Sequence, residues 1–192
     1  MFAQDVAEFL ESIEINSINV VGFSIGGMIA FQLAVDHPNM IKRLVIVNSN
    51  IEIPVDSFKI KFQYFIYDLK MRFTTMKKIG LTRAYELFPK PEQEELRSQR
   101  IERFAENDKK AYINSIMAVK GWSVRDQLHK IKCPTLIIGS DEDYTPISVR
   151  EEFTALIPNA KLVVIKDARH AVAIEKPKEF NEILMSFLSE QN

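Results

Sequence analysis

The chain has 192 residues, of which 46% are hydrophobic, and a formal net charge of −1. This length predicts one domain with room for an inserted subdomain, and the composition is typical of a globular protein with a sizeable core. The balanced charge, without a Lys/Arg block, gives no support for nucleic-acid binding.

Membrane spans, a secretory leader and a disulfide framework are not expected either. No run of 18 apolar residues occurs, and the first residues have a helical pattern without a basic leader. The single cysteine, Cys133, precedes an apolar run and is interpreted as a small core residue in a reducing compartment. We therefore expect a cytoplasmic protein whose partner is neither a membrane nor a nucleic acid.

The first fifty residues alternate between helical and strand patterns. We predict helices over residues 2–14 and 26–36 and apolar strands over 18–22 and 44–47. The first helix is amphipathic, and its expected inward residues are Phe2, Val6, Phe9, Leu10 and Ile13. Apolar strands separated by helices indicate an α/β fold with a parallel sheet covered on both faces.

The strand pattern stops between residues 53 and 128. Four helices are predicted there, over residues 58–70, 76–88, 91–106 and 108–119. We interpret this insertion as a helical cap on a core made of residues 1–52 and 129–192. A helical extension without a ligand role is the alternative. Most aromatic rings between residues 58 and 73 are interpreted as core.

The sheet pattern resumes in the last third of the chain. A strand over residues 133–139 leads into the acidic loop Ser140–Pro146. A helix follows, with Ser148 as its N-cap and Glu151 at the spacing of a capping box. The final elements are a strand over 162–165, the loop Lys166-Asp167-Ala168-Arg169-His170, and an amphipathic helix over 177–189.

A serine stands between the first strand and the helix that follows it. The run Gly22-Phe23-Ser24-Ile25-Gly26 has the Gly-x-Ser-x-Gly pattern of a nucleophile elbow. We expect positions 22 and 26 to require glycine, because the turn is too tight for a side chain at either place. Ser24 should be strained, with the Ile25 N–H directed at an oxyanion. A glycine-rich turn carrying an inert serine is the alternative.

Three strands are followed by loops that carry a serine, acidic residues and a histidine. Because the carboxyl ends of parallel strands share one edge, Ser24, an aspartate and His170 can converge. An imidazole can take a serine proton, and a carboxylate orients the imidazole. Asp143 is our choice for the acid, with Asp141 second. His37 and His129 are interpreted as surface or structural residues.

The three motifs together resemble the α/β-hydrolase fold superfamily. The elbow, the strand Cys133–Gly139 with Asp143-Tyr144-Thr145-Pro146, and the loop ending at His170 carry the resemblance. It implies Ser24 as nucleophile, Asp143 as acid, His170 as base and Ile25 as one oxyanion donor. No cofactor or metal is implied.

The chain departs from the superfamily pattern ahead of the elbow strand, where members normally have several more strands. The resemblance implies that about half of the sheet and the second oxyanion donor are absent. We expect the elbow strand to be an edge, open to self-association, and this chain alone to be weakly active or inactive.

A serine hydrolase acting on a small ester, lactone or related carbonyl substrate is the function we expect. Carbon–carbon bond hydrolysis or cofactor-free perhydrolysis on the same triad is one alternative. A non-catalytic ligand-binding or regulatory protein, or an inactive fragment, is the other, and the absent amino-terminal strands favour it.

Overall fold

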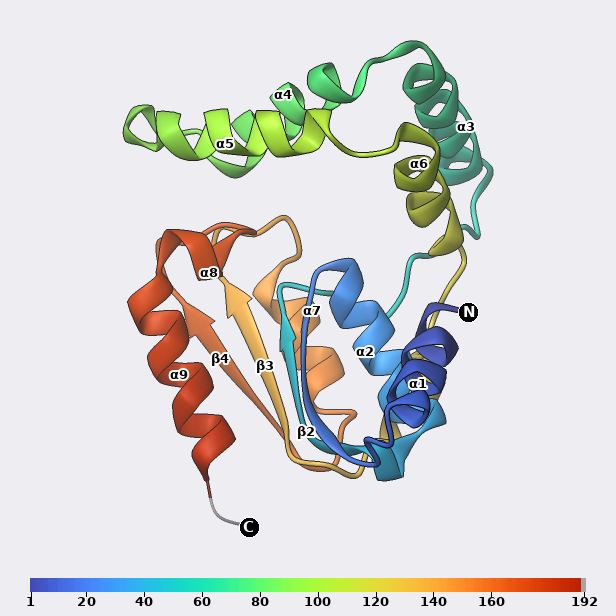
Figure 1. Cartoon of the computed structure of the whole chain (residues 1–192), viewed down its shortest axis with the longest axis vertical. Helices are drawn as coiled ribbons and strands as arrows, with labels where there is room; N and C mark the ends of the chain where they lie inside the picture. Colours follow the sequence, from blue (N-terminus) through green and yellow to red (C-terminus); the bar gives the residue numbers. More distant parts are fainter. Residues whose placement is uncertain (191–192) are drawn as a thin grey trace. The chain divides into compact units, whose positions relative to one another are not determined.

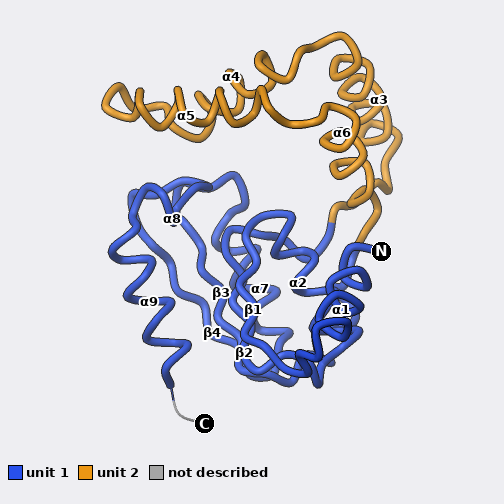
Figure 2. Tube along the Cα trace, in the orientation of Figure 1, with its two compact units in different colours: residues 1–52, 123–192 blue, residues 53–122 orange. Residues whose placement is uncertain are grey.

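The structure, a computed structural model, describes residues 1–190 and divides into two compact units (Figures 1 and 2). Unit 1 combines residues 1–52 with the chain from Ser123 onward, and unit 2 is the insertion Ile53–Trp122. Unit 1 contains all the strands of the sheet, whereas unit 2 is helical.

Unit 1 is built on a parallel sheet of four strands in the order β1-β2-β3-β4. The strands are β1 (Ile18–Phe23), β2 (Ile41–Val47), β3 (Thr135–Ser140) and β4 (Ala160–Ile165). Both central strands are apolar and largely buried, as expected for strands covered on two faces. The predicted α/β fold is confirmed, and β1 is an edge strand in the described chain.

Helices cover the two faces of this sheet. On one face lie α2 (Ile25–Asp36), which meets Gly22 of β1, and α7 (Ile147–Thr154), which meets Gly139 of β3. On the other face α8 (Val172–Glu175) and α9 (Pro177–Ser189) complete an apolar core. Its buried members are Val45, Val47, Leu136, Ile138, Ile165, Ala168, Val172, Phe180 and Phe187.

The remaining elements of unit 1 connect or flank the sheet. Helix α1 (Phe2–Ser12) packs on α2, and the short 3₁₀ helices η1 (Pro38–Met40) and η3 (Arg125–Lys130) lead into β2 and towards β3. The predicted inward side of α1 is confirmed at Leu10 but not at Phe9 or Ile13. Ala3, Ala7 and Leu10 face inward, and Phe9 is 61% exposed. The apolar periodicity identified the helix but not the face that packs, because two small alanines lie in the contact.

Unit 2 consists of α3 (Phe58–Phe73), α4 (Met76–Leu87), η2 (Pro91–Gln93), α5 (Glu94–Ala105) and α6 (Lys109–Ala118). Helices α4 and α5 pack closely because Gly80 has no side chain to strike Phe104. The core interpretation of the α3 rings is wrong for several of them. Those more than half exposed are Phe58, Phe62, Phe65 and Phe73.

The predicted N-cap of α7 is also wrong. The helix begins at Ile147, and Pro146 occupies the cap position without a side-chain hydrogen bond. Ser148 therefore lies inside the first turn, where its hydroxyl cannot cap the helix. The capping-box spacing arose there by chance, and the fixed φ of proline provides a helix start without a capping side chain.

Candidate active site

Ser24 occupies a strained turn between β1 and α2. Its backbone has φ 53° and ψ −121°, a combination that is costly for a residue with a side chain. The Ser24 N–H donates to the carbonyl of Val47 at 3.0 Å, and its own carbonyl accepts from the Ser49 hydroxyl at 2.7 Å. The turn is thus held by β2 and the segment after it, and Ser24 lies at the carboxyl edge of the sheet.

The glycines around Ser24 divide into two kinds. A Cβ on Gly22 would lie 2.7 Å from the Gly27 Cα, so the predicted close approach is confirmed there. Gly26 is different, because a Cβ on it would meet nothing within 4 Å, and the steric reason predicted for it is wrong. The second crowded position is Gly27, where a Cβ would strike the Ser49 side chain.

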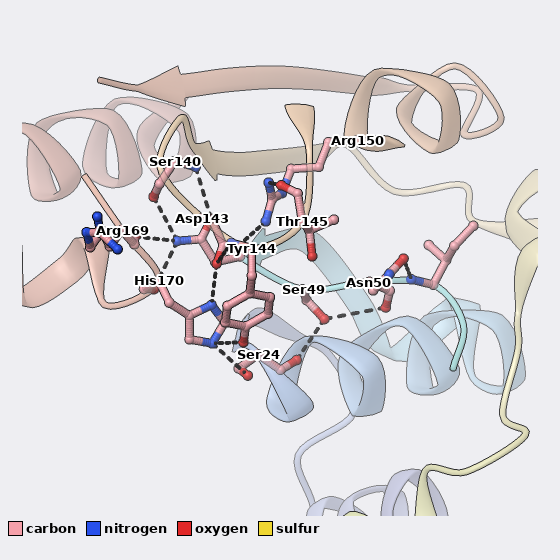
Figure 3. Close-up of polar contacts among 12 residues, drawn as sticks. Ser24, Ser49, Asn50, Ser140, Asp143, Tyr144, Thr145, Arg150, Arg169 and His170 are labelled. Carbon is pink, nitrogen blue, oxygen red and sulfur yellow. Dashed lines mark hydrogen bonds and ion pairs between the residues drawn. The ribbon is translucent and has the colours of Figure 1, made fainter. Parts of the chain in front are cut away.

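A continuous line of hydrogen bonds joins the three predicted site residues (Figure 3). His170 Nε2 lies 3.0 Å from Ser24 Oγ, and His170 Nδ1 lies 2.9 Å from Asp143 Oδ1. A carboxylate can only accept, so Nδ1 carries the proton and Nε2 of the neutral ring is an acceptor. In this tautomer the imidazole is oriented to receive the Ser24 proton.

Only one of the three neighbouring acids faces the imidazole. Asp141 is exposed, and its Oδ1 accepts from the Ala168 N–H at 3.4 Å. Glu142 forms an ion pair with Arg169 at 3.2 Å. The loop geometry therefore brings Asp143, and not Asp141, to His170.

Arg150 on α7 holds the other side of the Asp143 carboxylate. Its guanidinium pairs with Asp143 Oδ2 and also donates to the carbonyl of Thr145, while the Tyr144 N–H donates to Asp143 Oδ1 at 2.8 Å. The Asp143 and Arg150 side chains are both fully buried. Sequence reasoning missed Arg150, because an arginine within a charged helix is ordinarily solvated.

Asn48 fixes the loop that carries His170. Its side-chain N–H₂ donates to the His170 carbonyl at 2.9 Å and to the Ser140 hydroxyl at 2.8 Å, and its Oδ1 accepts from the Ser140 N–H at 3.0 Å. A further bond reaches the carbonyl of Arg169 at 3.1 Å. Asn48 is buried at the end of β2 with φ 41°, and it ties the ends of β2 and β3 to the histidine loop.

Two aromatic rings flank the imidazole of His170. The Phe23 ring centroid lies 4.9 Å from it, and the Tyr144 ring centroid 4.4 Å. The Tyr144 hydroxyl also lies 2.6 Å from His170 Nε2, beside Ser24. Sequence analysis placed Tyr144 only in a turn, and no motif indicated that its hydroxyl reaches the histidine.

The predicted oxyanion donor is the first residue of α2. The N–H of Ile25 is one of the four at a helix start that have no partner within the helix. The positive end of the helix dipole lies at the same place. A developing negative charge beside Ser24 Oγ would therefore meet a favourable field.

The other two histidines lie outside this arrangement. His37 ends α2, where its Nε2 lies 3.3 Å from Gln4 Oε1, and His129 is exposed in η3. Within residues 1–190 no group of three or more His, Cys, Asp or Glu side chains is placed to hold a metal ion. None of the helices in that range is long and apolar enough to cross a membrane.

Comparison with known proteins agrees with this architecture. The family model described as the alpha/beta hydrolase fold matches residues 1–177. The chain therefore belongs to the α/β-hydrolase fold family, and it is an enzyme of the hydrolase class.

Individual relatives are about a quarter identical to this chain over the aligned residues. A Serratia proteamaculans protein, provisionally named carbamate hydrolase RutD, is 27% identical over 201 residues, covering 97% of this chain and 71% of that protein. A poly(3-hydroxyalkanoate) depolymerase from Ectopseudomonas oleovorans is also 27% identical, covering 98% and 67%. The crystal structure of a hydrolase from Pseudomonas aeruginosa PA01 matches with a TM-score of 0.85 at 26% identity, covering 98% and 71%.

Proposed function

We propose that this protein is a serine hydrolase that acts on a small ester, lactone or related carbonyl substrate through a Ser24–His170–Asp143 triad. The observation that carries the proposal is the unbroken line of hydrogen bonds from Ser24 Oγ through the imidazole to Asp143 Oδ1. The strained backbone of Ser24 supports it further, because strain of this kind is characteristic of a nucleophile elbow.

The geometry supports an acyl-transfer mechanism. As Ser24 Oγ attacks the substrate carbonyl carbon, its proton passes to His170 Nε2, and the Ile25 N–H stabilises the oxyanion. Asp143 stabilises the imidazolium through Nδ1. The proton then goes from Nε2 to the leaving group, which departs and leaves an acyl-enzyme. Water that gives a proton to His170 Nε2 attacks the acyl carbon, the bond to Ser24 Oγ breaks, and Nε2 returns the proton to Oγ as the acid product leaves.

The substrate class rests on the chemistry of the triad and on the relatives. A carbamate and a polyester, the compounds in the names of two relatives, both present a carbonyl carbon to a nucleophile. In this proposal unit 2 is the cap, since it is a compact helical insertion between β2 and β3.

Active-site labelling tests the nucleophile. A fluorophosphonate should form one covalent adduct per chain, mapped to Ser24 by mass spectrometry and lost in Ser24→Ala. Ser148→Ala, a change to an exposed serine on α7, is the matched control and should label like the wild type. An adduct that persists in Ser24→Ala, or a folded protein that forms none, would contradict the proposal.

A panel of activated esters and lactones then tests the substrate class. Ser24-dependent release of alcohol or ring-opened product supports it. A protein that labels at Ser24 and hydrolyses other compounds but none of the panel would keep the nucleophile but lose the proposed substrate class.

A further inference from the structure

Two hydroxyl groups compete for one nitrogen of His170. The Tyr144 hydroxyl lies 2.6 Å from Nε2, and Ser24 Oγ lies 3.0 Å from the same atom (Figure 3). Because Nδ1 faces the Asp143 carboxylate, Nε2 of the neutral ring has a single lone pair to offer. A phenol is a stronger hydrogen-bond donor than an aliphatic alcohol, and it is also the closer of the two.

The place that the phenol occupies is needed during acyl transfer. Nε2 first receives the Ser24 proton, then passes it to the leaving group, and finally takes a proton from the attacking water. The leaving atom and the water must each come within hydrogen-bond distance of Nε2. The Tyr144 hydroxyl already lies at that distance, so it stands where those atoms must be.

Tyr144 can leave this place without disturbing the acid. Its residue is 72% exposed, and its backbone N–H donates to Asp143 Oδ1 at 2.8 Å. A change of side-chain rotamer would carry the ring into solvent while the backbone anchor and the Asp143–Arg150 pair stay in position.

We propose that Tyr144 is a positioning residue whose phenol occupies Nε2 of the general base, His170, in the resting enzyme. The substrate displaces this phenol from Nε2. This inference rests on the proposed serine hydrolase function. It adds a gate to that mechanism: the lone pair of Nε2 becomes fully available to Ser24 only after the phenol has moved.

The test compares Tyr144→Phe with the wild type. Phenylalanine keeps the ring beside His170 and deletes only the oxygen. With a small fluorophosphonate, Ser24 Oγ bonds to phosphorus, fluoride leaves, and the Ser24 proton passes to Nε2. Releasing one hydrogen bond from Nε2 should raise the second-order rate of labelling about 2- to 10-fold. Ser148→Ala, a change to an exposed serine on α7, should label at the wild-type rate.

A spectroscopic measurement isolates the hydrogen bond from catalysis. The Ser24→Ala variant removes one of the two hydroxyls described at Nε2 and leaves the Tyr144 phenol. Adding Tyr144→Phe should move the ¹⁵N signal of Nε2 towards that of an acceptor without a partner. A purely structural role for the ring would leave this signal in place, and an unmoved signal overturns the proposal.

The kinetic outcomes separate the gate from the function. Faster Ser24-dependent labelling of Tyr144→Phe supports the gate. Equal or slower labelling, still dependent on Ser24, overturns the gate and leaves the serine hydrolase standing. Absence of labelling in both folded proteins overturns the proposed function, and the gate falls with it.

Discussion

Arg150 and Asp143 form an ion pair in which both side chains are fully buried. The pair occupies Asp143 Oδ2 and leaves Oδ1 to His170. The pair explains how the Asp143 carboxylate keeps one orientation although it lies in a loop, because Arg150 on α7 binds the oxygen that does not face His170. A buried pair of this kind gives little net stability by itself, but removing one partner leaves an uncompensated charge.

Replacing Arg150 with methionine should therefore destabilise the fold strongly. We expect Arg150→Met to lower the free energy of unfolding by about 3–5 kcal/mol, measured by urea denaturation. Arg125→Met is the matched control, because Arg125 pairs with Glu52 and Glu152 on the surface. Each such surface pair contributes about 1 kcal/mol or less. Equal effects of the two substitutions would show that the buried pair has no special role.

Asp143→Asn should slow Ser24 labelling far more than Asp141→Asn. The amide can no longer stabilise the imidazolium and favours the wrong tautomer, which costs about 10⁴-fold in comparable triads. Asp141 binds the Ala168 N–H, so its amide variant should label almost normally. Because Asp143→Asn also unpairs Arg150, its folded fraction is measured by circular dichroism under the same conditions. A reversed order would assign the acid to Asp141.

Spacing and strand pattern predicted which residues converge, but not what holds them. Ser24, Asp143 and His170 each follow a strand of a parallel sheet, so topology alone brings them to one edge. The burial of Arg150 depends on Gly139 lying opposite it. A Cβ there would be 2.9 Å from Arg150 Cδ, and this long-range fit leaves no local signal.

Other features depended on packing that the sequence pattern does not encode. Gly26 was predicted to be sterically required from its place in the motif, whereas the crowded position is Gly27 against Ser49. The sequence favours a core position for the rings of α3 because apolar residues are usually buried, yet Phe58 is 84% exposed. In both cases the residue type indicates a kind of environment, but the atoms that surround the residue depend on packing with distant parts of the chain.

Asn48→Asp should destabilise the protein although the two side chains have the same shape. The Asn48 amide donates to the Ser140 hydroxyl and to the carbonyls of Arg169 and His170. A carboxylate oxygen at that position would face two carbonyl oxygens without a proton to offer. We expect a loss of about 2–3 kcal/mol in the free energy of unfolding and slower labelling of Ser24. Asn19→Asp, on the exposed side of β1, is the control and should change either quantity little.

Cys133 should be an unreactive thiol in the folded protein. The residue is buried, and burial raises the pKa of its thiol above the ordinary value. Little reactive thiolate is then present at pH 8, and an aromatic disulfide reagent should react slowly until denaturant is added. Reaction of the native protein at the rate of a free thiol would contradict this expectation.

The same shift predicts how stability depends on pH. The folded thiol has a higher pKa than the unfolded one, so ionisation favours the unfolded chain. The contribution of Cys133 is therefore present below the unfolded value of about 8.5 and is lost as the pH rises through and above it. Cys133→Ala should remove this part of the decline, which urea titrations at several pH values would measure.

The free edge of β1 is expected to associate with a second copy of the chain. Among residues 1–190, β1 bonds to β2 along one side only, so its other side presents backbone N–H and C=O groups that a second strand can pair with. Val21 and Phe23 project from this strand with exposed fractions of 46% and 45%. They share a face with Val45 and Val47 of β2, which are covered in the core beneath α9.

Val21→Lys should weaken this association, because it puts a charge on the apolar side of the edge strand. Leu156→Lys is the matched control, since Leu156 is 43% exposed just after α7, away from β1, and gains the same charge. Sedimentation velocity over a range of protein concentrations should show dimers or larger species for the wild type and for Leu156→Lys. For Val21→Lys the same series should be dominated by the monomer. A wild type that stays monomeric throughout, or two variants that associate equally, would rule out β1 as the contact.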